Sequence, residues 1–223
     1  MGELRMYAIG IDEVRDMFGA TPQVAGRLRT IASEAFRVPR VGQASPGRLG
    51  KLGPLFRRAP DAPVIPPGTP LPSDIETLLA GRFVAPERLR VSWRVVDVWL
   101  AERSWARHSL DRSAPEIDQL EFELTRAGLP SQYGVRKLMA LDAQLPLRPA
   151  TGMTVGYSKH AHVLASGRAL SDCLPQVQQH SRERAQRLAD FLLGFESLAG
   201  QAQADQRPAP DLFVTFDRDD SPP

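Results

Sequence analysis

The chain has 223 residues, of which 42% are hydrophobic and 24% are charged. These values are close to the averages of globular proteins, so they exclude a disordered chain and predict one well-sized core. The single cysteine, Cys173, excludes an internal disulfide, and the net charge of +2 excludes a strongly basic or acidic chain as a whole. With no apolar leader and no apolar run of about 20 residues, we expect a cytoplasmic protein that does not span a membrane.

The first residues predict a strand followed by two helices. Apolar side chains alternate over residues 4–11, as in a half-buried strand. Asp12 then fits the N-cap of a short helix that has acidic residues in its first turn. Thr21 followed by Pro22 predicts the start of a second helix, whose apolar stripe continues to about Phe36.

Residues 38–72 are rich in glycine, proline and arginine and show no periodicity. Proline removes backbone donors and interrupts helices, so we predict a long loop or arm here, within one domain that spans residues 1–223. Large apolar side chains within this arm predict that parts of it lie against the folded body.

Positive charge is concentrated in the arm and just before it. From Arg27 to Arg58 there are eight basic residues and one acid, Glu34, so the rest of the chain is net acidic by about five charges. Such a basic cluster predicts docking to an acidic protein surface or to phosphates. The arm residues that we predict to contact the partner are Arg40, Arg48, Lys51, Arg57 and Arg58.

Two helices are predicted after the arm. Ser73, with Glu76 three residues later, matches a capping box and predicts the start of a short helix. Apolar residues at spacings of three and four then predict a long amphipathic helix from Pro86 to about Ala106. Its valines leave a strand near residues 95–98 as an alternative.

Three tryptophans recur at intervals of six residues, at Trp93, Trp99 and Trp105. A spacing of six does not keep side chains on one face of a single helix, so at least one tryptophan is expected at the surface or an interface. We predict that this residue is Trp105 and that it contacts the partner together with the arm.

The second half of the chain predicts further helices and one internal strand. Ser113 fits the cap of a helix that ends near Gly128, and a short helix follows around residues 134–143. Alternation over residues 153–157 favours a strand that leads into a helix, and the last helix begins around Ser181.

A closing strand is predicted at residues 211–217, after a polar spacer at residues 200–210. With strands at both ends and helices between them, the chain predicts an α+β fold. We expect a small mixed or antiparallel sheet in which the N- and C-terminal strands pair at the centre, packed by several helices. Residues 217–223 are expected to form a frayed tail.

The residues that could carry chemistry form no complete catalytic pattern. His160 and His162 are candidate bases or ligands, but the zinc-type spacings, glycine-rich phosphate loops and nucleophile elbows are missing, so we predict no metal and no cofactor. Cys173 is expected to be a buried small hydrophobic residue. The acidic pairs, with a spacing of two on a helix, are expected to be solvated; they are Glu116 with Asp118 and Glu121 with Glu123.

Three segments carry a resemblance to a known family. They read "MYAIGIDEVRDMFGA" near the start, "AGLPSQYGVRKLMALDAQLPLRPATGMTVGY" in the middle and "DLFVTFDRD" near the end, within a likeness that covers about half the chain. They resemble bacterial proteins of the YfbM-like family, especially actinobacterial relatives. This resemblance implies an α+β fold and carries over no activity or functional residue.

The leading functional hypothesis is a non-catalytic, cytoplasmic binding protein. It engages an acidic protein partner through the basic arm, in a regulatory or toxin-neutralising role. One alternative is a nucleic-acid-binding accessory protein, although only two aromatic residues, Phe36 and Phe56, accompany the basic cluster. Another is a hydrolase that uses His160 or His162 with a carboxylate.

Overall fold

The structure, a computed structural model, describes residues 2–36, 68–111 and 114–218. A four-stranded antiparallel sheet lies at its centre, with the strand order β2-β1-β4-β3. The strands are β1 (Glu3–Ile9), β2 (Ala106–Asp111), β3 (Met153–Ser158) and β4 (Asp211–Asp217). The predicted α+β fold is therefore confirmed, and the N- and C-terminal strands pair at the centre of the sheet, as expected.

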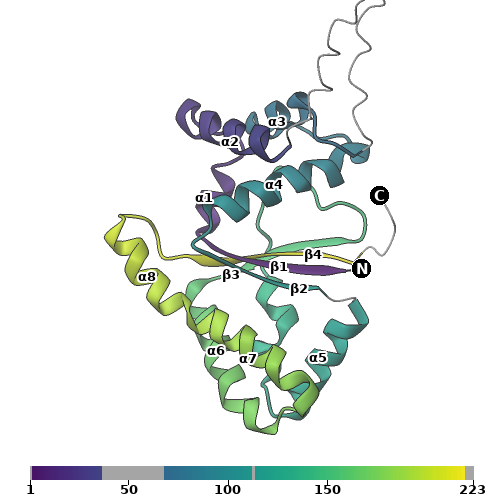
Figure 1. The fold of residues 1–223 in the computed structure, drawn as a ribbon, viewed down its shortest axis with the longest axis vertical. Coiled ribbons are helices and arrows are strands. Elements are labelled where there is room, and N and C mark those ends of the chain that lie inside the picture. The colour runs from purple at the N-terminus through teal and green to yellow at the C-terminus, as the bar shows by residue number, and fades with distance from the viewer. Residues whose placement is uncertain (1, 37–67, 112–113, 219–223) are drawn as a thin grey trace, which may run out of the picture.

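Helices cover both faces of this sheet (Figure 1). One face, here called the α4 face, is covered by α1 (Ile11–Arg15), α2 (Pro22–Ala35), α3 (Pro72–Leu79) and α4 (Leu89–Arg103). The other, here called the α6 face, is covered by α5 (Ala114–Arg126), α6 (His160–Cys173), α7 (Gln179–Leu193) and α8 (Phe195–Ala204). Short 3-10 turns lie at Pro86–Arg88, Ser131–Tyr133, Val135–Met139 and Leu174–Gln176.

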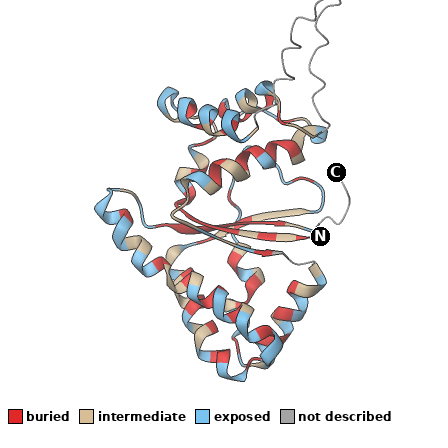
Figure 2. Cartoon of the chain, in the orientation of Figure 1, coloured by how far each residue is buried: buried red, intermediate tan, exposed pale blue. Residues whose placement is uncertain are grey.

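Alternation along the central strands divides the core into two parts. Leu4 and Met6 point to the α6 face, whereas Tyr7 and Ile9 point to the α4 face. Successive side chains of a strand point to opposite sides, so a strand buried on both sides feeds two cores. Figure 2 shows the buried residues gathered on the sheet and on the inward sides of the helices.

Strand β2 is the element that the sequence interpretation missed. The long helix was expected to reach about Ala106, but α4 ends at Arg103 and Ser104 adopts an extended conformation. The strand Ala106–Asp111 follows at once and pairs with β1. It lies at the edge of the sheet and carries polar residues such as Arg107 on one side, so the apolar alternation that marks a buried strand is weak there.

The helix starts are confirmed in one case and corrected in two. Pro22 is the first residue of α2 after Thr21, as predicted. The first helix is capped from Gly10, not Asp12. The third begins at Pro72, where the Leu71 amide donates to Asp74 Oδ2 at 2.7 Å, so the capping carboxylate is not that of Glu76. Proline favours the first helical position, so the N-cap is Leu71, two residues before the predicted Ser73.

The end of the chain also differs from the sequence interpretation. Residues 200–204, expected at the start of a polar spacer, form the second half of helix α8 (Phe195–Ala204), whose Phe195 and Ala202 are buried. Asp217, at which the predicted closing strand and the predicted tail overlap, is the last residue of β4. Residues 219–223 and the predicted cap Ser113 lie outside the described residues. Within the described ranges, none of the helices combines the length and the apolar character that a bilayer crossing requires.

Candidate functional site beneath helix α4

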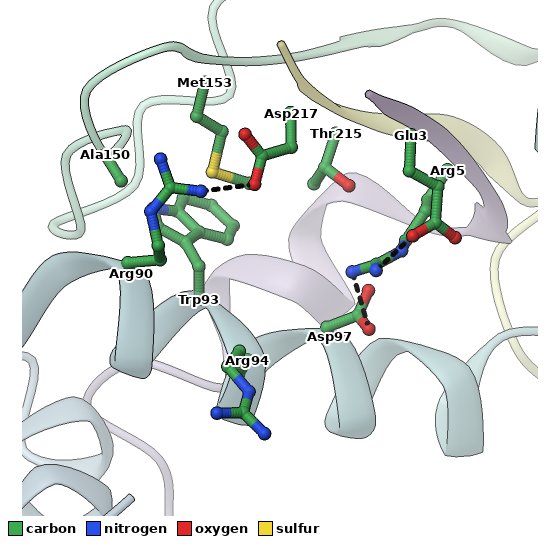
Figure 3. Close-up of a pocket in the computed structure, with 10 residues that line it drawn as sticks. All are labelled: Glu3, Arg5, Arg90, Trp93, Arg94, Asp97, Ala150, Met153, Thr215 and Asp217. Carbon is green, nitrogen blue, oxygen red and sulfur yellow. Dashed lines mark hydrogen bonds and ion pairs between the residues drawn. The ribbon is translucent and has the colours of Figure 1, made fainter. Parts of the chain in front are cut away.

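A cavity of about 250 Å³ lies between α4 and the open end of the sheet (Figure 3). The start of β1 and the end of β4 line it with side chains that face α4, which passes over them. Three arginines and three acids dominate the lining, which comprises Glu3, Arg5, Arg90, Trp93, Arg94, Asp97, Ala150, Met153, Thr215 and Asp217. The cavity therefore combines charged side chains with apolar ones such as Trp93 and Met153, which belong to the core of the α4 face.

Arg5 is the centre of an ionic network on β1. Its guanidinium contacts Glu3 and forms an ion pair with Asp97, with Nη1 2.9 Å from Oδ2, and the Tyr7 hydroxyl donates to Asp97 Oδ1 (Figure 3 shows the two ion pairs). The hydrogen bond with Glu3, together with the Asp97 carboxylate, raises the pKa of Arg5. Burial, followed by the charge of Asp97, raises the pKa of Tyr7, so this phenol stays a hydrogen-bond donor.

A second ion pair closes the other end of the cavity. Arg90 on α4 donates to Asp217 Oδ2 at 2.6 Å and to the Thr151 carbonyl at 2.9 Å. Trp93, one turn along, donates its indole N–H to the Arg148 carbonyl at 2.8 Å. Helix α4 is thus tied to the loop before β3 and to the end of β4, which fixes the cavity walls.

Arg94 marks the place where the arm leaves and rejoins the described chain. Its guanidinium donates to the Gly68 carbonyl at 2.7 Å and lies 5.9 Å from the Phe36 ring centroid. Phe36 is the last described residue before residues 37–67, and Gly68 is the first after them. Both ends of this segment therefore lie against one side chain at the rim of the cavity.

Further arginines fix the helices beside this point. Arg88 donates to Asp74 Oδ1 at 3.0 Å, and burial alone would raise the pKa of Asp74, but the hydrogen bond from Arg88 holds it lower. Arg29 on α2 forms two hydrogen bonds with Glu76 on α3, at 2.6 and 2.8 Å. Arg29 belongs to the basic cluster identified in the sequence, so at least one of its charges is neutralised by a carboxylate of the same chain.

The acids of the cavity are held in ion pairs and hydrogen bonds within the chain. Neither histidine nor cysteine lines the cavity, and the acids are held by arginines or by Tyr7. Nucleophilic catalysis needs a nucleophile beside a base, and general acid–base catalysis needs a titratable group free to exchange a proton. A network of this kind instead offers fixed charges and hydrogen-bond donors at the surface.

The predicted partner contacts are only partly within the described residues. Arg40, Arg48, Lys51, Arg57 and Arg58 lie outside them. Trp105 is half-buried, with the Arg207 guanidinium 4.2 Å from its ring centroid, and its indole nitrogen has no hydrogen-bond partner in the described part. Its role as a partner contact stays a prediction.

The two candidate histidines lie on the first turn of α6, after the predicted strand. His160 Nδ1 is 3.0 Å from the Pro210 carbonyl oxygen, and the His162 ring lies 5.8 Å from that of Tyr133. Cys173 is buried as predicted, and burial raises its thiol pKa. Among the described residues, no three His, Cys, Asp or Glu side chains converge as metal ligands would.

Glu123 is a buried carboxylate that the sequence interpretation placed in solvent. Its Oε1 accepts hydrogen bonds from Gln119 at 2.8 Å and from His180 Nε2 at 2.9 Å. Burial alone would raise the pKa of Glu123, but hydrogen bonds from Ser181, Gln119 and His180 hold it below its usual range. The partners His180 and Ser181 are at the start of α7. The periodicity of α5 alone could not predict this contact between two helices.

Comparison with protein-family models, curated proteins and solved structures found no match to this chain. The resemblance to the YfbM-like family therefore stays a prediction.

Proposed function

We propose that this chain is a non-catalytic, cytoplasmic binding protein that engages an acidic protein partner through the basic arm, in a regulatory or toxin-neutralising role. The observation that carries the proposal is the position of Arg94, which contacts both Phe36 and Gly68. The two described residues that flank residues 37–67 therefore both lie at Arg94, which supports a partner site in this region.

The charge distribution supports an acidic partner. Residues 37–67 hold six basic side chains and one acid, whereas the whole chain has a net charge of only +2. The remainder is therefore net acidic, so the excess positive charge of the chain lies in this segment. Complementary charge raises the rate of encounter and suppresses wrong partners.

The test is an affinity pull-down from a lysate of the source organism, followed by mass spectrometry and by binding measurements with the purified partner. The test variant changes Arg48, Arg57 and Arg58 to Glu. A matched control changes Arg126, Lys137 and Arg168 to Glu, three exposed cations on elements that cover the α6 face. We expect the arm variant to lose an acidic partner that the control retains.

Equal recovery by the two variants, or no partner with the wild-type chain, would contradict the proposal. The nucleic-acid alternative is distinguished by anisotropy with a labelled oligonucleotide. If it holds, affinity falls steeply and linearly on a log–log plot against salt concentration, with a slope set by the number of phosphates neutralised.

A further inference from the structure

The edge of the sheet at β2 is free within the described part of the chain. Strand β2 pairs with β1 on one side, and no described segment pairs with its other side. The opposite edge is partly covered, because Leu141 forms a bridge with Tyr157 of β3 through hydrogen bonds of 3.3 and 3.0 Å. A free edge presents unpaired backbone donors and acceptors, which another extended chain can satisfy.

Three hollows follow this edge from one end to the other. A hollow of about 560 Å³ lies at the start, between Trp105, Arg107 and α4. One of about 540 Å³ lies above Arg107 and Ser109, on the α4 side. The third, of about 400 Å³, lies between His108 and the first turns of α7. The free backbone edge thus has room on both sides for the side chains of an added strand.

The side chains around these hollows leave positive charge uncompensated. Arg107 on β2 and Arg184 on α7 form no ion pair with any described residue, whereas Arg187 beside them pairs with Glu183 at 2.6 Å. His180, in the first turn of α7, lines the same hollow as Arg184, and its Nε2 is hydrogen-bonded to Glu123 Oε1.

Acids of the α4 wall are mostly paired within the chain. Glu3 and Asp97 both contact Arg5, and Asp97 also accepts from Tyr7. Glu102 is the further acid, and it lies beside Trp105 at the start of the edge.

His108 provides a second polar group at the centre of the edge. Its ring stacks on Phe191 of α7, with centroids 5.3 Å apart, and its buried Nε2 has no hydrogen-bond partner in the described part. Burial and the charge of Arg187 lower the pKa of His108, so its ring is neutral near pH 7.

We propose that the free edge of β2 binds an extended acidic peptide segment of a partner protein by strand addition. The segment pairs with the outer backbone of β2, and its carboxylates approach Arg107 on one side and Arg184 on the other. The arm of this chain is a poor occupant, because it is itself strongly basic. A second copy is also disfavoured, because pairing two β2 edges would bring the uncompensated arginines together.

The inference does not depend on the arm. The probe is a fluorescein-labelled octapeptide of alternating glutamate and valine, and its binding to the full chain is followed by anisotropy. Two control peptides separate the contributions, one with lysine in place of glutamate and one N-methylated at alternate residues, which keeps its charge but cannot pair along one edge. Hydrogen exchange reports protection of the β2 amides.

We expect binding of the acidic peptide, slowed exchange in β2, and at least a tenfold weaker affinity in the double variant Arg107→Glu and Arg184→Glu. The affinity of the control double variant Arg126→Glu and Arg168→Glu should stay within about twofold of the wild-type value, since solvent and salt screen exposed charges that lie far from the site. The arm variant with Arg48, Arg57 and Arg58 changed to Glu should also bind this peptide normally, whether or not the arm binds its own partner.

Several results would overturn the inference. Equal affinity for the N-methylated peptide would show that charge, not strand pairing, holds the probe. Protection of β2 that rises with protein concentration without peptide would assign the edge to a second copy. Protection that is present in the free chain and lost in the arm variant would assign it to the arm, and no binding at millimolar peptide would exclude the site.

Discussion

The two faces of the central sheet are stabilised by different means. On the α6 face, β1 and β4 contribute apolar side chains such as Leu4, Met6, Val214 and Phe216, which are fully buried. On the α4 face, the same strands carry an apolar patch at one end, and a partly exposed ionic network around Arg5 at the other, where β1 starts and β4 ends. The difference indicates that the α6 face holds the fold together, while the outer end of the α4 face fixes charges at the surface.

The physical reason lies in how each kind of contact depends on water. Apolar burial stabilises in proportion to the area removed from water. Partly exposed ion pairs contribute little net stability, because solvent screens them and ordering the side chains costs entropy. The three arginines and three acids around this cavity therefore add little stability, so this end of the α4 face is the better candidate for recognition.

The largest effect is expected from truncating the α6-face core. Phe216→Ala removes a fully buried ring and should lower the free energy of unfolding by about 3–5 kcal/mol, measured by urea denaturation. Phe83→Ala is the control, since Phe83 is 70% exposed and its loss should change stability little. Similar losses of unfolding free energy in the two variants would contradict the view that the α6 face stabilises the fold.

A close backbone approach on the α6 face gives the next effect. A Cβ added at Gly156 of β3 would lie 2.1 Å from the Met139 carbonyl oxygen, so Gly156→Ala must shift the turn over the strand. We expect a loss of about 1–3 kcal/mol by thermal or urea unfolding. Gly200→Ala in α8 is the control with the opposite sign: its Cβ meets nothing within 4 Å, and alanine favours the helix by about 1 kcal/mol.

The next effect measures one hydrogen bond of the ionic network on the α4 face. Tyr7→Phe deletes the donor to the Asp97 carboxylate and should cost about 1.5 kcal/mol, as for a hydrogen bond to a charged group. The cost should largely disappear in an Asp97→Ala background, which the double-mutant cycle measures. An unchanged cost in that background would mean that Tyr7 acts through packing and not through the ionic network.

The smallest effect concerns the buried carboxylate on the α6 face. Because the pKa of Glu123 is lowered in the fold, its ionised form stabilises the protein above the ordinary pKa of about 4.3. This contribution is lost as the pH falls through the lower folded-state pKa. Glu123→Gln should therefore be less stable than the wild type near pH 7, and the gap should narrow on acidification.

Chemical denaturation at several pH values checks this expectation. Glu196→Gln on the exposed side of α8 is the control and should show no such convergence. A gap of constant size from neutral pH to pH 3 would indicate that the glutamine fails for reasons of shape and not of charge.

Much of the fold could be predicted from the sequence, because period and capping are local properties. The alternation over residues 4–11 and 211–217 identified the two central strands, and Thr21 with Pro22 identified the start of α2. Strand β2 was missed because an edge strand is buried on few sides, so its apolar alternation is weak.

The candidate site was less accessible to sequence reasoning. Arg5 and Asp97 lie on different elements, and neither stands in a recognised motif. An arginine in a strand otherwise buried on both faces was the available signal, since a charge there requires a partner from elsewhere. Asp217 was assigned to a tail because the acids that follow it resemble a solvated end.

The sequence by itself determined the fold class, the terminal strands, most helices and the concentration of basic residues between Arg27 and Arg58. Only the tertiary structure decided which charges compensate one another, where the ends of the arm lie, and which edge of the sheet is left unpaired. The physical reason is range: hydrophobic period and helix caps act within a few residues, whereas the energy of a charge or a backbone edge depends on whatever the fold places beside it.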